Sequence, residues 1–159
     1  MKIIKSAAFI FLALTIVFAG SCGRNFITTR DSKPMSEKVL KYLDTDDVDG
    51  LKSMFCEKTI SETPDLDEQI EAAMDFYKGK TVSYRGILGT EGESVDNGVT
   101  TKLRMNPHIT DIETDAGEKY HIKIYAYIIY MKDTTMEGIS EIDIYAENDT
   151  VCTIGNNFG

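Results

Sequence analysis

The sequence predicts an α+β domain in which N-terminal helices pack on an antiparallel sheet. Up to Gly79 the apolar residues recur at spacings of three and four, the period of a helix with one buried side. From Val99 onward they alternate with polar residues, the period of a strand with one buried face. The chain has 159 residues, of which 42% are hydrophobic, so we expect one folded core rather than disorder.

Residues 1–21 have the pattern of a lipoprotein signal peptide. Lys2 and Lys5 make the start positive, and an apolar run follows over residues 7–18. This run is shorter than the roughly 20 residues that span a bilayer, and it ends in small residues. The small residues directly before Cys22 resemble the lipobox of bacterial lipoproteins, in which diacylglycerol is attached to the cysteine thiol. An ordinary secretory signal with an incidental cysteine is the alternative.

The lipobox interpretation places the mature protein outside the cytoplasm, lipid-anchored to the cell membrane through Cys22. Residues 22–35 are polar and show no apolar period, so we expect a short tether and then a single domain over residues 36–159. Loss of Lys2 and Lys5 with the signal changes the formal charge from −9 to −11. This acidic balance argues against a nucleic-acid partner, because binding phosphate backbones needs an excess of basic residues.

Three helices are expected in the first half of the domain. The first covers residues 36–43, and the second follows a cap at Asp46 or Asp47 and buries apolar residues between 48 and 55. The third begins at Asp65, with Glu68 three residues later as in a capping box, and it ends before Gly79.

Four strands are expected after the helices, at residues 99–109, 120–131, 140–147 and 151–154. Pro107 cannot donate a hydrogen bond to a neighbouring strand, so it indicates an edge or a bulge. Ile112 has an even number, whereas the core-facing residues before it have odd numbers, and this change favours the bulge. Even-numbered residues of the second and third strands should face the core. The numbers of two directly paired residues should therefore sum to an even number. If one strand slipped by one residue against the other, Glu141 and Asp143 would be buried.

Helices followed by long antiparallel strands resemble the cystatin-like cone of nuclear-transport-factor-two-like domains. That resemblance implies helices lying across the concave face of a curved sheet, often with a pocket between them. The segments 50–55 (GLKSMF), 65–70 (DLDEQI) and 76–80 (FYKGK) are similar to a family of lipoproteins from Gram-positive gut bacteria that carry a domain of unknown function. The likeness would cover residues 36–154 and brings no activity with it.

Two cysteines remain in the mature domain, and their state is open. An extracytoplasmic location permits a disulfide between Cys56 and Cys152. Both also lie in apolar stretches, where a free cysteine behaves as a small buried hydrophobe.

No metal site, cofactor site or nucleophile motif is expected. His108 and His121 could share one sheet face with Glu141 or Asp143, but their spacing does not match a zinc motif. The acidic segment 44–50 fails both ends of an EF-hand loop, so a helix cap is the better interpretation. Serine elbows and phosphate loops are missing from the sequence.

The tyrosines supply the remaining candidates. We expect three of them on the core-facing side, at the rim of a pocket: Tyr84, Tyr120 and Tyr130. An enzyme acting on a small apolar substrate in the cone could use them. Four large side chains are expected on the opposite face, where they predict a contact with a protein partner or a second copy: Tyr125, Tyr127, Ile129 and Met131.

Together these features favour a membrane-anchored extracytoplasmic binding module that takes a small ligand in the cone or a protein partner on the sheet. The alternatives left open are the enzyme just described and a structural homodimer.

Overall fold

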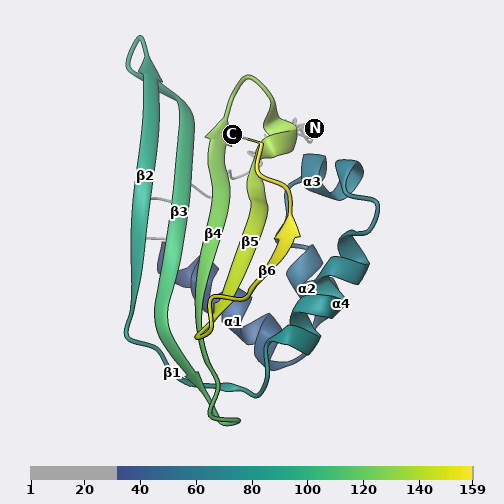
Figure 1. The fold of residues 1–159 in the computed structure, drawn as a ribbon. Coiled ribbons are helices and arrows are strands. Elements are labelled where there is room, and N and C mark those ends of the chain that lie inside the picture. Colours follow the sequence, from purple (N-terminus) through teal and green to yellow (C-terminus); the bar gives the residue numbers. More distant parts are fainter. Residues whose placement is uncertain (1–31, 159) are drawn as a thin grey trace, which may run out of the picture.

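The computed structural model describes residues 32–158 (Figure 1). The predicted signal peptide, Cys22 and residues 22–31 of the tether lie outside the described residues. Within the described range, none of the helices combines the length and the apolar character needed to cross a bilayer.

The predicted α+β class is confirmed: four helices come first, and they pack against an open antiparallel sheet of six strands (Figure 1). The helices are α1 (Ser32–Asp44), α2 (Val48–Lys52), α3 (Glu57–Glu62) and α4 (Leu66–Phe76). The strands are β1 (Thr81–Ser83), β2 (Gly86–Asp96), β3 (Val99–Thr114), β4 (Lys119–Tyr130), β5 (Gly138–Ala146) and β6 (Val151–Gly155), with a 3₁₀ helix, η2 (Thr134–Met136), before β5.

The helices differ from the prediction in three places. The capping box expected at Asp65 is not formed, since Asp65 precedes α4 without a side-chain hydrogen bond to the helix. Helix α1 begins four residues earlier than expected, so residues 32–35 belong to the folded domain; Pro34 is tolerated because it lies in the first turn. Helix α3 was not predicted, because it is only six residues long and its cap is Cys56, whose Sγ accepts from the Thr59 N–H at 3.5 Å. The expected cap at Asp47 is confirmed, since its side chain accepts from the Gly50 N–H at 2.8 Å.

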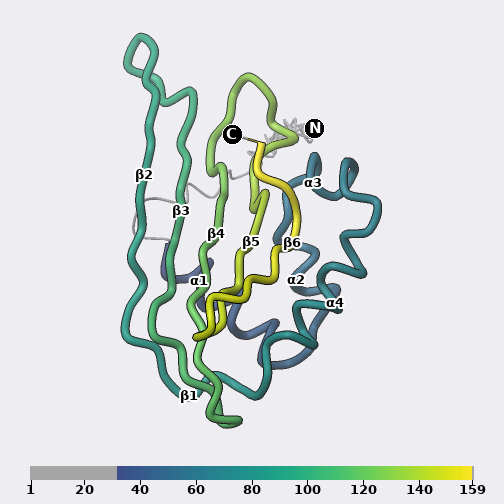
Figure 2. The backbone as a smooth tube through the Cα atoms, in the orientation of Figure 1, coloured from purple at the N-terminus to yellow at the C-terminus, as the bar shows by residue number. Residues whose placement is uncertain are grey.

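The sheet has the strand order β1-β3-β4-β5-β6, and β2 pairs with β3 alongside β1. In Figure 1, α1 lies behind the sheet and α2, α3 and α4 lie beside β6, so none of the helices in residues 32–158 covers the face toward the viewer, here called the outer face. Figure 2 shows the tip of the β2–β3 hairpin projecting beyond the helices. Strand β1, of three residues, and strand β2, of eleven, were not predicted from the sequence, since neither alternates clearly.

The predicted register of β4 and β5 is confirmed over most of their length. The pairs run from Tyr120 with Ala146 to Tyr125 with Glu141, and every pair sums to an even number until a shift at Ala126. Within this stretch the even-numbered residues face the helices, as expected, and Tyr120, Ile122, Ile124, Ile142 and Ile144 are buried.

The bulge expected near Ile112 is present, between Ile109 and Ile112, where Asp111 has a φ of +50°. The suggestion that Pro107 marks an edge is wrong. Pro107 pairs with Gly89 of β2, so β3 is an interior strand, and the error follows from missing β2.

The side of the sheet that faces the helices is filled by the protein's own side chains. Five isoleucines from three strands are fully buried there: Ile109, Ile122, Ile124, Ile142 and Ile144. They pack in one core with Val39 and Leu43 of α1 and Ile70 of α4. The described residues therefore fill the concave side, where a ligand of the cone was expected, with a close-packed core.

Candidate functional site

The three tyrosines expected at one pocket lie in three different places. Tyr120 is buried, and its hydroxyl donates to the Phe76 carbonyl and accepts from the Lys78 N–H, both at 3.0 Å. Tyr84 is half-buried beside an open groove between α1 and β1, and its hydroxyl donates to Glu37 at 3.2 Å.

Tyr130 lies on the outer face, not on the core-facing side. Tyr127 pairs with Arg104, but Ile129 pairs with Leu103, so β4 has an extra residue at this point. Such a bulge reverses the alternation beyond it. As a result the Tyr130 ring stacks on the Tyr127 ring, with their centroids 5.1 Å apart.

The same bulge changes the expected partner contact. Tyr125 and Tyr127 lie together on the outer face as predicted, and Tyr130 joins them. Ile129 instead turns to the other face beside Leu103, and Met131 is 53% exposed in the turn after β4. Tyr127 itself is covered by its neighbours and is only 4% exposed.

Cations lie over these tyrosines. The Lys102 Nζ lies 5.0 Å from the Tyr127 ring centroid and 5.3 Å from that of Tyr130, and the Arg104 guanidinium lies 5.9 Å from that of Tyr125. These distances are within the range of cation–π attraction. We call the five residues the cation–tyrosine strip; it runs along the half of the outer face nearest the hairpin tip.

A second group, the histidine cluster, continues along the outer face from the strip: His108, His121, Lys123, Asp143 and Tyr145. His121 lies flat on Tyr145, with centroids 4.6 Å apart and ring planes within 9°, and His108 meets His121 edge-on at 5.5 Å. Asp143 is 9% exposed and accepts from the hydroxyls of Tyr145 at 3.2 Å and Thr153 at 2.7 Å.

The titration of the histidine cluster follows from partial burial and mixed charge. Burial lowers the pKa of His108, and His121 and Lys123 lower it further. Burial and Lys123 also lower the pKa of His121, against a smaller opposing effect of Asp149 and Asp111. Both imidazoles are therefore neutral at physiological pH. Burial and the Asp143 carboxylate raise the pKa of Tyr145.

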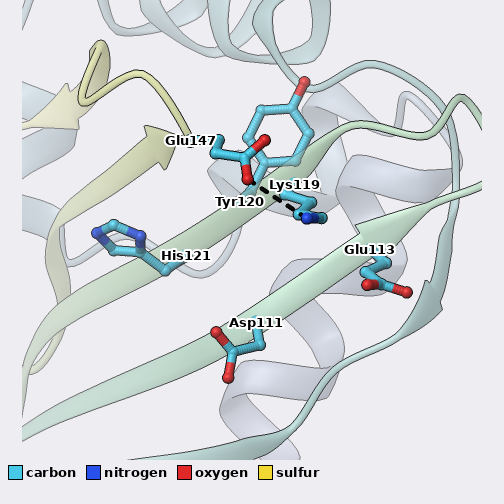
Figure 3. A pocket seen from close by; sticks show the side chains of 6 residues that line it. All are labelled: Asp111, Glu113, Lys119, Tyr120, His121 and Glu147. Carbon is cyan, nitrogen blue, oxygen red and sulfur yellow. Dashed lines mark hydrogen bonds and ion pairs between the residues drawn. The ribbon is translucent and has the colours of Figure 1, made fainter.

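An open cleft of about 280 Å³ lies at the end of the outer face opposite the strip (Figure 3). Three of its charged groups already form ion pairs, since Lys119 pairs with Glu147 at 3.3 Å and Asp111 pairs at 3.2 Å with Arg85, which does not line the cleft. Figure 3 shows the Tyr120 hydroxyl turned away from these carboxylates. The cleft therefore offers exposed polar groups but no tyrosine hydroxyl for acid–base chemistry.

Metal ligands and a disulfide are not assembled in residues 32–158. No group of three or more His, Cys, Asp or Glu side chains is placed there to hold a metal ion. Cys56 and Cys152 are both free thiols, so the structure has no bridge between them. The Cys56 N–H bonds to Ile139 while Cys152 pairs with Ile144, and five residues of strand separate these points by about 16 Å, too far for a bridge.

Sequence reasoning anticipated part of this surface. It expected that His108 and His121 could share one sheet face with Glu141 or Asp143, and the structure confirms that shared face. It missed Tyr145, although the alternation of β5 puts residues 141, 143 and 145 on the same side of the sheet. It could not place Tyr130 there, because one extra residue in β4 leaves no mark in the hydrophobic pattern.

The fold and this surface define an α+β domain with a packed inner face and an aromatic, charged outer face. The family model for a domain of unknown function, DUF5104, matches residues 38–147, and the chain belongs to this family. No curated protein matches the sequence.

Proposed function

We propose that the protein is a membrane-anchored extracytoplasmic lipoprotein whose domain binds a protein partner over the cation–tyrosine strip. One observation carries the proposal: Lys102 lies over two stacked tyrosines on a sheet face that none of the described helices covers. Tyrosine and arginine are the residues most enriched at the energetic centres of protein interfaces, because they combine large apolar area with polar contacts.

The charge of the strip indicates the chemistry of the partner. Neither Lys102 nor Arg104 forms an ion pair with another described residue; the Arg104 Nε donates only to the Asn106 side chain, at 3.2 Å. A partner that presents carboxylates would pair with both cations and cover the exposed parts of the rings. The occupant we propose is therefore an acidic protein surface.

The alternatives from the sequence are less well supported. A ligand or substrate inside the cone would have to displace fully buried isoleucines. The hydroxyl of Tyr120, which an enzyme in the cone would use, is already bonded to two backbone groups. The membrane anchor rests on the lipobox-like sequence before Cys22.

The test uses the full chain in its own cell envelope. A photo-crosslinking amino acid at Tyr130 should give one defined adduct, and the same probe at Ile60, which is 41% exposed on α3, should not. Lys102→Glu together with Arg104→Glu should abolish the adduct. Adducts that are the same from both positions, or that survive the charge reversal, would overturn the proposed surface. An adduct of twice the monomer mass would assign the strip to a homodimer instead.

The anchor is tested separately. Cys22→Ser should remove metabolic lipid labelling and release the protein from the membrane fraction. Retention of label and membrane association in Cys22→Ser would contradict the lipoprotein part of the proposal.

A further inference from the structure

The two edges of the sheet are treated differently by the fold. At the β6 edge, helix α4 packs along the strand, and its Gln69 side chain accepts from the Gly155 N–H at 2.9 Å (Figure 1). At the other edge, β2 pairs with β3 alone among the described residues, and residues 88–96 are exposed throughout. One edge is closed by the protein, and the other is left open.

The open edge has few features that prevent pairing with another strand. It is eleven residues long, and it contains neither lysine nor proline, the residues that most often block an exposed edge. Its ladder with β3 is regular until a shift between Ser94 and Val95, close to the hairpin tip. An edge strand of this length is a template for an added strand.

Two glycines in β2 have no explanation within the described part of the chain. Gly89 and Gly92 lack a positive φ, and a Cβ on either would have no atom within 4 Å. Glycine weakens a strand interior relative to alanine, and it often marks a place where another backbone approaches closely. Here that close approach can come only from outside the described chain.

The backbone groups that face the open edge can be assigned from the ladder. The Met131 N–H donates to the Thr101 carbonyl, so Thr101 directs its polar groups toward β4. By alternation Lys102 directs its groups toward β2, where it pairs with Ser94. Even-numbered residues of β2 therefore bond to β3, and odd-numbered ones, including Gly89 and Glu91, direct their N–H and C=O groups outward.

The side chains along this edge are acidic. Glu91 and Glu93 are two residues apart, so they lie on one side of the strand, and Asp96 follows at the tip. None of the three forms an ion pair with a described residue, and Glu93 accepts only from the Thr100 hydroxyl at 2.6 Å. A second copy in this position would bring the same acids together on a chain of formal charge −9, which disfavours a homodimer.

We propose that the free edge of β2 binds an extended protein segment as an added antiparallel or parallel strand, and that this segment carries lysine or arginine at alternate positions beside Glu91 and Glu93. The edge lies outside the cation–tyrosine strip. It takes a basic partner, whereas the strip takes an acidic one. The inference therefore goes beyond the proposed function, and it stands if the strip binds nothing.

The test uses a fluorescent octapeptide in which lysine and valine alternate. The peptide is titrated against the intact mature chain without its lipid anchor. Gly89→Pro removes one outward N–H while leaving the bonds to β3 intact, because proline is tolerated at an edge. Gly89→Ala is the matched control, since it keeps the N–H and its Cβ meets open space. We expect Gly89→Pro to weaken binding about tenfold or more relative to Gly89→Ala, because main-chain hydrogen bonds supply much of the affinity in strand addition.

A second measurement needs no variant. Amide exchange in the wild-type protein should slow at Gly89 and Glu91 when the peptide binds, and stay unchanged at Thr90 and Gly92, whose N–H groups already face β3.

Charge reversal by Glu91→Lys and Glu93→Lys should abolish binding of the basic octapeptide. Equal binding by the proline and alanine variants together with unchanged exchange at Gly89 would overturn the proposal, because the peptide would then be held by charge alone. A concentration-dependent dimer that Gly89→Pro abolishes would also overturn it, by assigning the edge to a second copy.

Discussion

Asp44, the last residue of α1, accepts two hydrogen bonds from Thr81, the first residue of β1. The Thr81 N–H donates at 2.7 Å and its hydroxyl at 2.8 Å, and the Tyr77 hydroxyl lies 2.7 Å from the Thr81 hydroxyl. A carboxylate is unfavourable at the C-terminal end of a helix, where the helix dipole is negative. Its position is explained by this contact, which joins the first helix to the first strand.

Asp44→Ala should destabilise the domain, because it leaves the half-buried Thr81 N–H without its acceptor. We expect the free energy of unfolding to fall by about 1–3 kcal/mol, measured by urea denaturation. Glu71→Ala, an exposed acid in the middle of α4, is the control and should change it by less than about 0.5 kcal/mol. Equal effects of the two substitutions would show that the Asp44 contact contributes no stability.

Tyr120→Phe should cost stability through the end of α4 rather than through any pocket. The hydroxyl joins the Phe76 carbonyl and the Lys78 N–H, and its loss should lower the free energy of unfolding by about 1–2 kcal/mol. Tyr84→Phe removes a hydroxyl bonded to the exposed Glu37 and should be close to neutral. A larger loss for Tyr84 than for Tyr120 would contradict the structural role given to Tyr120.

The parts of the fold that the sequence predicts are those in which one strong period continues over many residues. The register of β4 with β5 follows from the burial of alternate isoleucines, and the alternation puts the histidines and Asp143 on one face. Strand β2 was not predicted because both of its faces are exposed, so no hydrophobic period is required. Tyr130 was misplaced because a single extra residue between Tyr127 and Ile129 reverses the face without changing the composition.

Gly155 is required by both backbone conformation and space. Its φ is +84°, and a Cβ there would collide with the Ser140 carbonyl and lie 2.9 Å from the Phe55 ring. Gly155→Ala should lower the free energy of unfolding by about 1–3 kcal/mol or more. Gly92→Ala meets open space and should be neutral or slightly stabilising in the same denaturation experiment. Loss of stability at Gly92 comparable to that at Gly155 would show that this account of the two glycines is wrong.

The two cysteines should behave as thiols of different accessibility. Cys56 is 1% exposed and Cys152 is half-buried, and burial raises the pKa of the Cys152 thiol. A thiol reagent should therefore react slowly with the folded domain, because the thiolate is the reactive form. In denaturant without a reductant, both Cys56 and Cys152 should react rapidly. Thiols that appear only after reduction would reveal the bridge that the structure lacks.

The histidine cluster should make the domain less stable in mild acid. The pKa values of His108 and His121 are lowered in the folded state, while the unfolded chain keeps values near about 6.5. Below that pH the unfolded state binds more protons than the folded state, so the free energy of unfolding falls as the pH drops. Above that pH both states hold the histidines neutral, and the free energy of unfolding is no longer reduced by their protonation. The Nε2 atom of His108, buried without a hydrogen-bond partner, is consistent with a neutral ring.

The chain has only these two histidines, so the double substitution His108→Gln with His121→Gln removes every imidazole. Denaturation at about pH 5 and about pH 8 should show a smaller loss of stability on acidification for this variant than for the wild type, the remaining slope coming from the carboxylates. Imidazole proton resonances followed by NMR should titrate with midpoints below about 6.5. Midpoints at or above that value, or an identical loss of stability in the two proteins, would contradict a neutral histidine cluster on this face.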